Sequence, residues 1–215
     1  MSDPHHAQGG QGGPEVPPRE PTERLFFALW PAEDEREALA RAAAKPVRSS
    51  GGRPVPAENL HVTLAFLGSV PVRRVPELRT LALATADAFA RHEPLALRFE
   101  RLVHWSQSEI LCALGAEELG AGADPREGEL RATEFLAGAL KDQAAAAGFT
   151  PDLKPFRPHV TVARKVLRAP RERALRHSVL WRCTAFALIA SRTHASGAIY
   201  SVVEFYPLGK PDKAR

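Results

Sequence analysis

The sequence predicts an α+β fold: a bilobal, pseudo-twofold arrangement of two antiparallel sheets with outer helices around a central cleft. Two observations carry this prediction. Apolar residues recur at helix spacing in some segments and at strand spacing in others, with polar or Gly- and Pro-containing connections between them. A short motif, His-Val-Thr followed by an aliphatic residue, occurs at residues 61–64 and again at 159–162. The 215 residues suit one domain or two closely packed lobes.

The first half of the chain predicts alternating strands and helices that end in a hairpin. A β-rich apolar run closed by Pro31 indicates a buried strand, and Gly68 ends a second such run. The expected apolar stripe of the second helix is Leu78, Leu81, Leu83 and Phe89. The expected elements are a strand at 24–31, a helix at 32–44, a loop at 46–56, a strand at 60–68, a helix at 76–91 and strands at 95–103 and 110–114.

The second half repeats this rhythm. A long helix is expected at 127–147, with Gly148 as its C-cap and with Leu130, Phe135, Leu136 and Leu140 on its apolar face. A strand at 159–166 follows two prolines. Two long β-type runs, 179–190 and 199–207, are separated by a polar bend that contains Gly197.

The ends of the chain differ from its centre. Residues 1–22 hold four Gly and five Pro without apolar periodicity, which predicts a disordered leader, and 209–215 form a short polar tail after a domain at 23–208. No signal peptide or membrane-length apolar segment is recognisable. Cys112 and Cys183 stand 71 positions apart in apolar runs, which indicates buried inert thiols. We therefore expect a cytoplasmic protein without a membrane partner.

Positive charge is concentrated in one segment. Residues 154–182 carry nine Lys or Arg and one acid, a net charge of +8, whereas the rest of the chain carries 20 basic and 24 acidic residues. Such a local field favours binding of polyanions, and reversing the charge of Arg171 and Arg173 is expected to weaken it. A codon bias toward Arg, which supplies 23 of the 29 basic residues, is the alternative, but it does not account for the loss of acids.

The repeated motif suggests a symmetrical site. Because side chains alternate between the faces of a strand, His61 and Thr63 share one face while Val62 and its aliphatic neighbour face the core. The same holds for His159 and Thr161. If the two halves pack face to face, two imidazoles and two hydroxyls line one groove.

These groups suit in-line displacement at phosphorus. One imidazole removes a proton from the attacking oxygen and the other protonates the leaving oxygen, which neutral pH permits because an ordinary histidine pKa is about 6.5. The threonines can donate hydrogen bonds to the phosphate oxygens. A single histidine of this kind on a strand is usually structural. The second copy at an equivalent position favours a catalytic role instead. Neither motif carries a carboxylate or thiol at ligand spacing, so no metal is expected.

The sequence resembles the two-histidine phosphoesterases, and within them the RNA 2′,3′-cyclic phosphodiesterases, a group also described as RNA 2′-5′ ligase-like. The resemblance covers residues 24–208 and rests on RLFFALWP, NLHVTLAFLG, KPFRPHVTVAR and SRTHASGAIYSVVEFYPL. It implies that His61 is the proton donor, that His159 is the proton acceptor, and that Thr63 and Thr161 bind the phosphate. It implies no cofactor.

The resemblance also assigns roles to two residues that follow the motifs. Arg164 matches an arginine beside the substrate, where its charge is expected to favour the neutral form of His159. Phe66 matches an aromatic residue that stacks on the base, although core packing is an equal alternative. Each stands five positions after its histidine, so in a regular strand its side chain would point to the opposite face. A bulge or a strand end, expected at Ala65 and at Ala163, would turn the two side chains into the cleft.

Hydrolysis of RNA 2′,3′-cyclic phosphate ends to 2′-phosphates is therefore the expected function. RNA 2′-5′ ligation and hydrolysis of small cyclic nucleotides are the enzymatic alternatives, and an RNA-binding module without turnover is the alternative from another class. The expected partner is RNA with cyclic phosphate ends, with tRNA fragments and cyclic nucleotides as candidates. No obligate protein partner is indicated.

Overall fold

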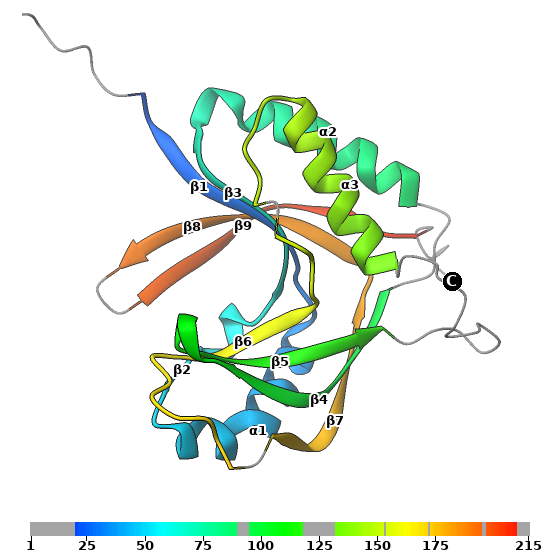
Figure 1. Cartoon of the computed structure of the whole chain (residues 1–215). Coiled ribbons are helices and arrows are strands. Elements are labelled where there is room, and N and C mark those ends of the chain that lie inside the picture. The colour runs from blue at the N-terminus through cyan, green and yellow to red at the C-terminus, as the bar shows by residue number, and fades with distance from the viewer. Residues whose placement is uncertain are drawn as a thin grey trace, which may run out of the picture.

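A computed structural model describes residues 20–89, 95–117, 132–152, 154–171, 173–194 and 197–209. It contains two antiparallel sheets, as expected (Figure 1). The β1 sheet has the order β3-β1-β8-β9 and consists of β3 (Val62–Pro71), β1 (Thr22–Leu29), β8 (Ala185–His194) and β9 (Gly197–Pro207). The β5 sheet has the order β2-β6-β5-β4-β7 and consists of β2 (Arg53–Pro54), β6 (His159–Arg164), β5 (Ile110–Glu117), β4 (Leu95–Trp105) and β7 (Ala174–Cys183).

Three helices cover the outer faces of the sheets. Helices α2 (Val75–Phe89) and α3 (Ala132–Ala146) pack against each other over the β1 sheet, and α1 (Glu33–Ser50) lies against the β5 sheet (Figure 1). Short 3₁₀ turns at Ala57–Asn59, Val72–Arg74 and Ser106–Ser108 complete the described elements. The α+β class and the two-sheet arrangement are thus confirmed.

The sheets do not correspond to the two halves of the chain. The N-terminal strand β1 pairs with β8, for example through Phe27 and Leu188, so the first and last strands share a sheet. The β5 sheet takes its strands from the middle of the chain. One continuous apolar core, which includes Phe27, Leu64, Phe99 and Trp181, runs through both lobes.

The first helix continues into the segment expected as a loop at 46–56 and ends at Ser50. A proline lacks the backbone N–H and usually ends a helix, yet Pro46 lies inside α1. Pro46, Val47 and Ser50 are buried together with Leu39, so packing of the last turns outweighs the missing hydrogen bond. The helix ends only where Gly51 adopts φ 69°, the left-handed conformation that glycine tolerates best.

The apolar run at 179–190 is two strands rather than one. The chain leaves the β5 sheet after Cys183 and enters the β1 sheet at Ala185, with a break at Thr184 whose carbonyl accepts a hydrogen bond from the Leu208 N–H at 2.7 Å. A continuous apolar run does not reveal such a change of sheet, because residues on both sides of the break are buried.

Two residues of the expected helix stripes face outward. Leu83 and Phe135 are each 51% exposed, whereas Leu78, Leu81 and Phe89 are buried as expected. Both cysteines are buried, which confirms that expectation, and burial raises the pKa of Cys112 and of Cys183 to about 12.

The boundaries of the chain are only partly described. Strand β1 begins at Thr22, and the expected leader up to residue 19, residues 127–131 of the expected long helix and the tail from residue 210 lie outside the described residues. Within the described part, no helix is long and apolar enough to cross a membrane.

Trp181 is expected to be a main anchor of α1 on the β5 sheet. Its ring is fully buried 4.8 Å from that of Phe99, and its indole N–H donates a hydrogen bond to the Glu35 carbonyl at 2.9 Å. Trp181→Ala should lower the free energy of unfolding by ~3–5 kcal/mol, measured by urea denaturation. The control Leu83→Ala should cost less than about 1 kcal/mol; equal losses would contradict this account of the core.

Candidate active site

A bulge in β3 decides which side chains of the first motif share a face. Along the pairing with β1, Phe27 lies opposite Ala65 and Ala28 lies opposite Thr63, so Leu64 has no partner. Leu64 and Ala65 are both buried, and the alternation resumes one residue late. Phe66 therefore returns to the face that carries Thr63.

The second motif contains the same irregularity. Along the pairing of β6 with β5, Leu111 lies opposite Ala163 and Cys112 lies opposite Thr161, so Val162 has no partner. Val162 and Ala163 are both buried, and Arg164 after them is exposed. The expected bulges are present, each beginning one residue before Ala65 or Ala163.

Because of these bulges, both motifs open into one cleft of about 420 Å³ between the sheets. All six site residues expected from the sequence line it, which contradicts the alternative that Phe66 is solely a core residue. The described residues that line it are Arg24, Phe26, Val55, Asn59, His61, Thr63, Phe66, His159, Thr161, Arg164, Ser191, Thr193, Ala198 and Tyr200.

Each catalytic candidate is oriented by the same backbone contact. Nδ1 of His61 lies 2.7 Å from the carbonyl oxygen of Asn59, and Nδ1 of His159 lies 2.7 Å from that of Arg157. A carbonyl oxygen can only accept, so Nδ1 carries the proton and donates in both rings. In the neutral rings Nε2 then holds the free lone pair, and it is the atom left to exchange protons with a substrate.

His61 is enclosed by aromatic rings. Trp30 stacks on it with ring centroids 5.5 Å apart and planes inclined by 15°, while Tyr200 at 5.1 Å meets it edge-on and Phe26 lies at 5.0 Å. Burial lowers the pKa of His61 to about 4, and it outweighs the opposing effect of the Asn59 hydrogen bond. The ring is therefore neutral at pH 7.

His159 has a different environment. It contacts only one aromatic ring that the structure describes, that of Trp105, with centroids 4.5 Å apart. Burial, followed by the positive charge of Arg157, lowers its pKa. The Arg164 charge also lowers the pKa of His61, after burial, and the expectation that it favours the neutral form of His159 stays a prediction. The bulge turns the guanidinium into the shared cleft, where it also acts on the other lobe.

The remaining lining is polar or aromatic. The Thr161 hydroxyl lies 3.9 Å from the buried Cys112 thiol, and the Arg24 guanidinium lies over the Phe66 ring at 5.4 Å from its centroid. The described lining residues include no carboxylate or thiol, and the described part of the chain has no cluster of three His, Cys, Asp or Glu that could hold a metal ion.

Sequence reasoning missed several residues of the cleft. Arg24 stands at the start of an apolar run, and Ser191, Thr193 and Tyr200 lie in a C-terminal segment far from either motif. The alternation of side chains along a strand offered one signal. Ser191 and Thr193 are polar residues two positions apart, so they lie on the same face of β8. Their connection with His61 required knowing that β1 pairs with both β3 and β8.

The chain is similar to several known proteins. The LigT-like phosphoesterase family model matches residues 29–110. The chain is 31% identical to the RNA 2′,3′-cyclic phosphodiesterase of Thermus thermophilus over 86% of this chain and 90% of that protein. It is 33% identical to the Escherichia coli enzyme of the same name over 68% of this chain and 74% of that one. The crystal structure of E. coli LigT with 3′-AMP matches with a TM-score of 0.70 and 29% identity, covering 88% of this chain and 100% of that chain.

The aromatic rings around His61 lead to a testable prediction about its pKa. In a proton NMR titration of the ligand-free protein, the His61 ring is expected to gain its proton only near pH 4, because burial disfavours the charged form. Tyr200→Ala admits water and should move that pKa upward toward 6.5, whereas Phe135→Ala, on the outer face of α3, should not. A His61 pKa near 6.5 in the unaltered protein would refute the account.

Proposed function

Since the chain belongs to the LigT-like phosphoesterase family, we propose that it hydrolyses 2′,3′-cyclic phosphate ends of RNA to 2′-phosphates by two-histidine acid–base catalysis. The observation that carries the proposal is the meeting of two His-x-Thr motifs in one cleft, each with Nδ1 bound to the backbone and Nε2 left for the substrate. Both curated relatives bear the name of this activity.

The proposed reaction is a single in-line displacement. Nε2 of His159 accepts a proton from water as the water oxygen attacks phosphorus. The bond from phosphorus to O3′ breaks, and Nε2 of His61 donates its proton to O3′. The products are a 2′-phosphate and a free 3′-hydroxyl. His159 has then gained a proton and His61 has lost one, and proton exchange with solvent restores both rings.

The substrate itself supplies the charge that this scheme needs. Before substrate binds, both rings are neutral at pH 7 because burial lowers their pKa. A cyclic phosphate carries one negative charge, and an anion beside an imidazole raises its pKa. We infer that His61, the more enclosed ring, takes up its proton together with the substrate. Arg157 favours the neutral form of His159, which is the form a proton acceptor requires.

The other lining residues suit the two ends of a nucleotide. Thr63, Thr161 and Arg164 can donate hydrogen bonds to the non-bridging phosphate oxygens, where negative charge concentrates during transfer. Phe66, with Arg24 over one face, offers a ring on which a base can stack. The related E. coli LigT has been crystallised with 3′-AMP, which supports a nucleotide site in this cleft.

Each histidine should be indispensable for turnover. His61→Ala and His159→Ala should each lower kcat on a 2′,3′-cyclic nucleotide by ~10²–10⁴-fold, since each removes one proton transfer. The assay is run with EDTA, because the scheme uses no metal. The control His104→Ala changes a histidine outside the cleft lining, bound to the Val166 carbonyl, and should retain activity.

Thermal melting of each variant separates lost chemistry from lost folding. Near-normal activity of a folded His61→Ala protein would contradict the two-histidine scheme. Activity that EDTA abolishes and one added metal restores would replace it with a metal-dependent scheme.

The assignment of donor and acceptor fixes the product. If His61 protonates O3′, phosphorus NMR of the reaction on a cyclic-phosphate oligonucleotide should show a 2′-phosphate and no 3′-phosphate. Chemically prepared 2′- and 3′-phosphate oligonucleotides provide the reference shifts. A 3′-phosphate would mean that the ribose lies the other way round and that the two histidines exchange roles.

A further inference from the structure

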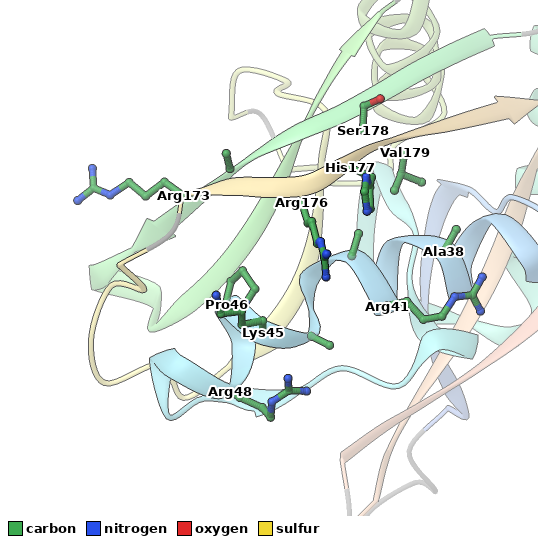
Figure 2. A pocket seen from close by; sticks show the side chains of 13 residues that line it. Ala38, Arg41, Lys45, Pro46, Arg48, Arg173, Arg176, His177, Ser178 and Val179 are labelled. Atoms are coloured by element: carbon green, nitrogen blue, oxygen red, sulfur yellow. The ribbon is translucent and has the colours of Figure 1, made fainter.

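A second cavity lies outside the cleft, between α1 and β7, and we call it the cationic groove. It has a volume of about 940 Å³. Its charged lining consists of Arg41, Lys45 and Arg48 from α1 and of Arg173, Arg176 and His177 from the β7 side (Figure 2). Figure 2 shows Arg176 pointing from β7 toward α1, and Arg173 extending outward at one end.

The groove exists because α1 is fastened to β7 at one end. The Glu35 carbonyl accepts the Trp181 indole N–H at 2.9 Å, and the Glu35 carboxylate accepts the Arg182 backbone N–H at 2.6 Å. Both contacts join the first turns of α1 to the end of β7. Beyond them, the lining includes small side chains such as Ala38 and Ala42, which fill little of the space.

The described lining is strongly cationic. Its charged residues are five Lys or Arg and one His, and none of the described lining residues is Asp or Glu. The carboxylate of Glu37, just outside it, pairs with Arg41 at 3.0 Å in an exposed contact, which offsets little of the field. A concave surface lined by cations attracts anions and raises their local concentration.

The uncharged residues of the lining indicate which class of anion the groove can bind. The described ones are Ala, Pro, Val and Ser, and no Phe, Trp or Tyr is among them, so they offer no ring on which a base could stack. None of the exposed large hydrophobic residues of the described chain lies in it, so the apolar anchor of a membrane-binding face is absent there. These features suit a phosphodiester backbone, which is bound through charge alone.

The groove and the cleft are distinct but neighbouring. Their described linings have no residue in common. A recess of about 220 Å³ beneath α1 shares Val55 with the cleft and Ala44 and Arg48 with the groove. A chain bound by its end in the cleft thus has a second, cationic surface beside it.

We propose that the cationic groove binds the phosphate backbone of the RNA whose cyclic end occupies the cleft. The inference rests on the proposed function, because it assigns the body of that same substrate to a second site. It predicts a preference for oligonucleotides over cyclic mononucleotides, without regard to base sequence. The preference should grow with RNA length until the backbone reaches the groove.

The double variant Arg173→Ser/Arg176→Ser tests the groove directly. On a long oligonucleotide with a 2′,3′-cyclic end at low salt, kcat/KM should fall roughly tenfold, since two phosphate contacts are lost. The plot of log(kcat/KM) against log[salt] should become shallower by ~1.4, or ~0.7 per lost contact on a single strand. On 2′,3′-cyclic AMP the kinetics should not change.

A charge-matched control separates the groove from net charge. Arg73→Ser/Arg79→Ser removes the same charge from α2 and its preceding turn, where both arginines form exposed ion pairs. It should leave both substrates and the salt slope unchanged. Melting temperatures of all variants confirm that the fold is intact.

The outcomes distinguish the two proposals. If the unaltered protein turns over neither substrate, the proposed function fails. If it turns over both and the groove variant matches the control on the oligonucleotide, the groove inference is overturned. The groove inference is also overturned if the groove binds an acidic peptide or anionic vesicles more tightly than it binds RNA with an unreactive end.

Discussion

The hydrogen bond from each histidine Nδ1 to the carbonyl two residues before it is the constraint on which the site depends. It fixes the tautomer, the ring orientation and the atom available for chemistry in one contact. The contact needs a histidine at the start of a strand, preceded by a backbone that has not yet joined the sheet. Both motifs meet that requirement. The bulge three residues later then turns Phe66 or Arg164 onto the face of the histidine, so a six-residue stretch of backbone builds each side of the cleft.

Two nearly identical motifs nevertheless create unlike histidines. Around His61 the rings of Phe26, Trp30 and Tyr200 exclude water, whereas His159 meets Trp105 and the charge of Arg157. A displacement at phosphorus needs one donor and one acceptor, and identical surroundings would give both rings the same proton affinity. The pseudo-symmetry therefore positions the groups, and the different neighbours on each side give them different tasks. Arg164, which belongs to one motif and acts on the histidine of the other, couples the two.

The sequence was most informative where local pattern and function coincide. The repeat placed His61, Thr63, His159 and Thr161 on one face, and the parity conflict at Phe66 and Arg164 required the bulges that the structure contains. It failed where tertiary packing decides. Burial holds Pro46 inside α1, and Thr184 divides an apolar run between two sheets. The basic run 154–182 is not one surface either: Arg164 lines the cleft, whereas Arg173 and Arg176 face three cations of α1 that are distant in sequence.

The pairing of β1 with both β3 and β8 has a consequence for how the protein is made. During synthesis, β1 and β3 leave the ribosome early, but the other edge of β1 stays without its native partner until β8 has been translated, more than 150 residues later. An apolar strand with an open edge is prone to pair with other chains. The last strand, β9, also carries Tyr200, one of the rings that enclose His61. A nascent chain halted before that point holds both motifs but lacks one wall of the cleft, so the site is complete only once β9 has been made.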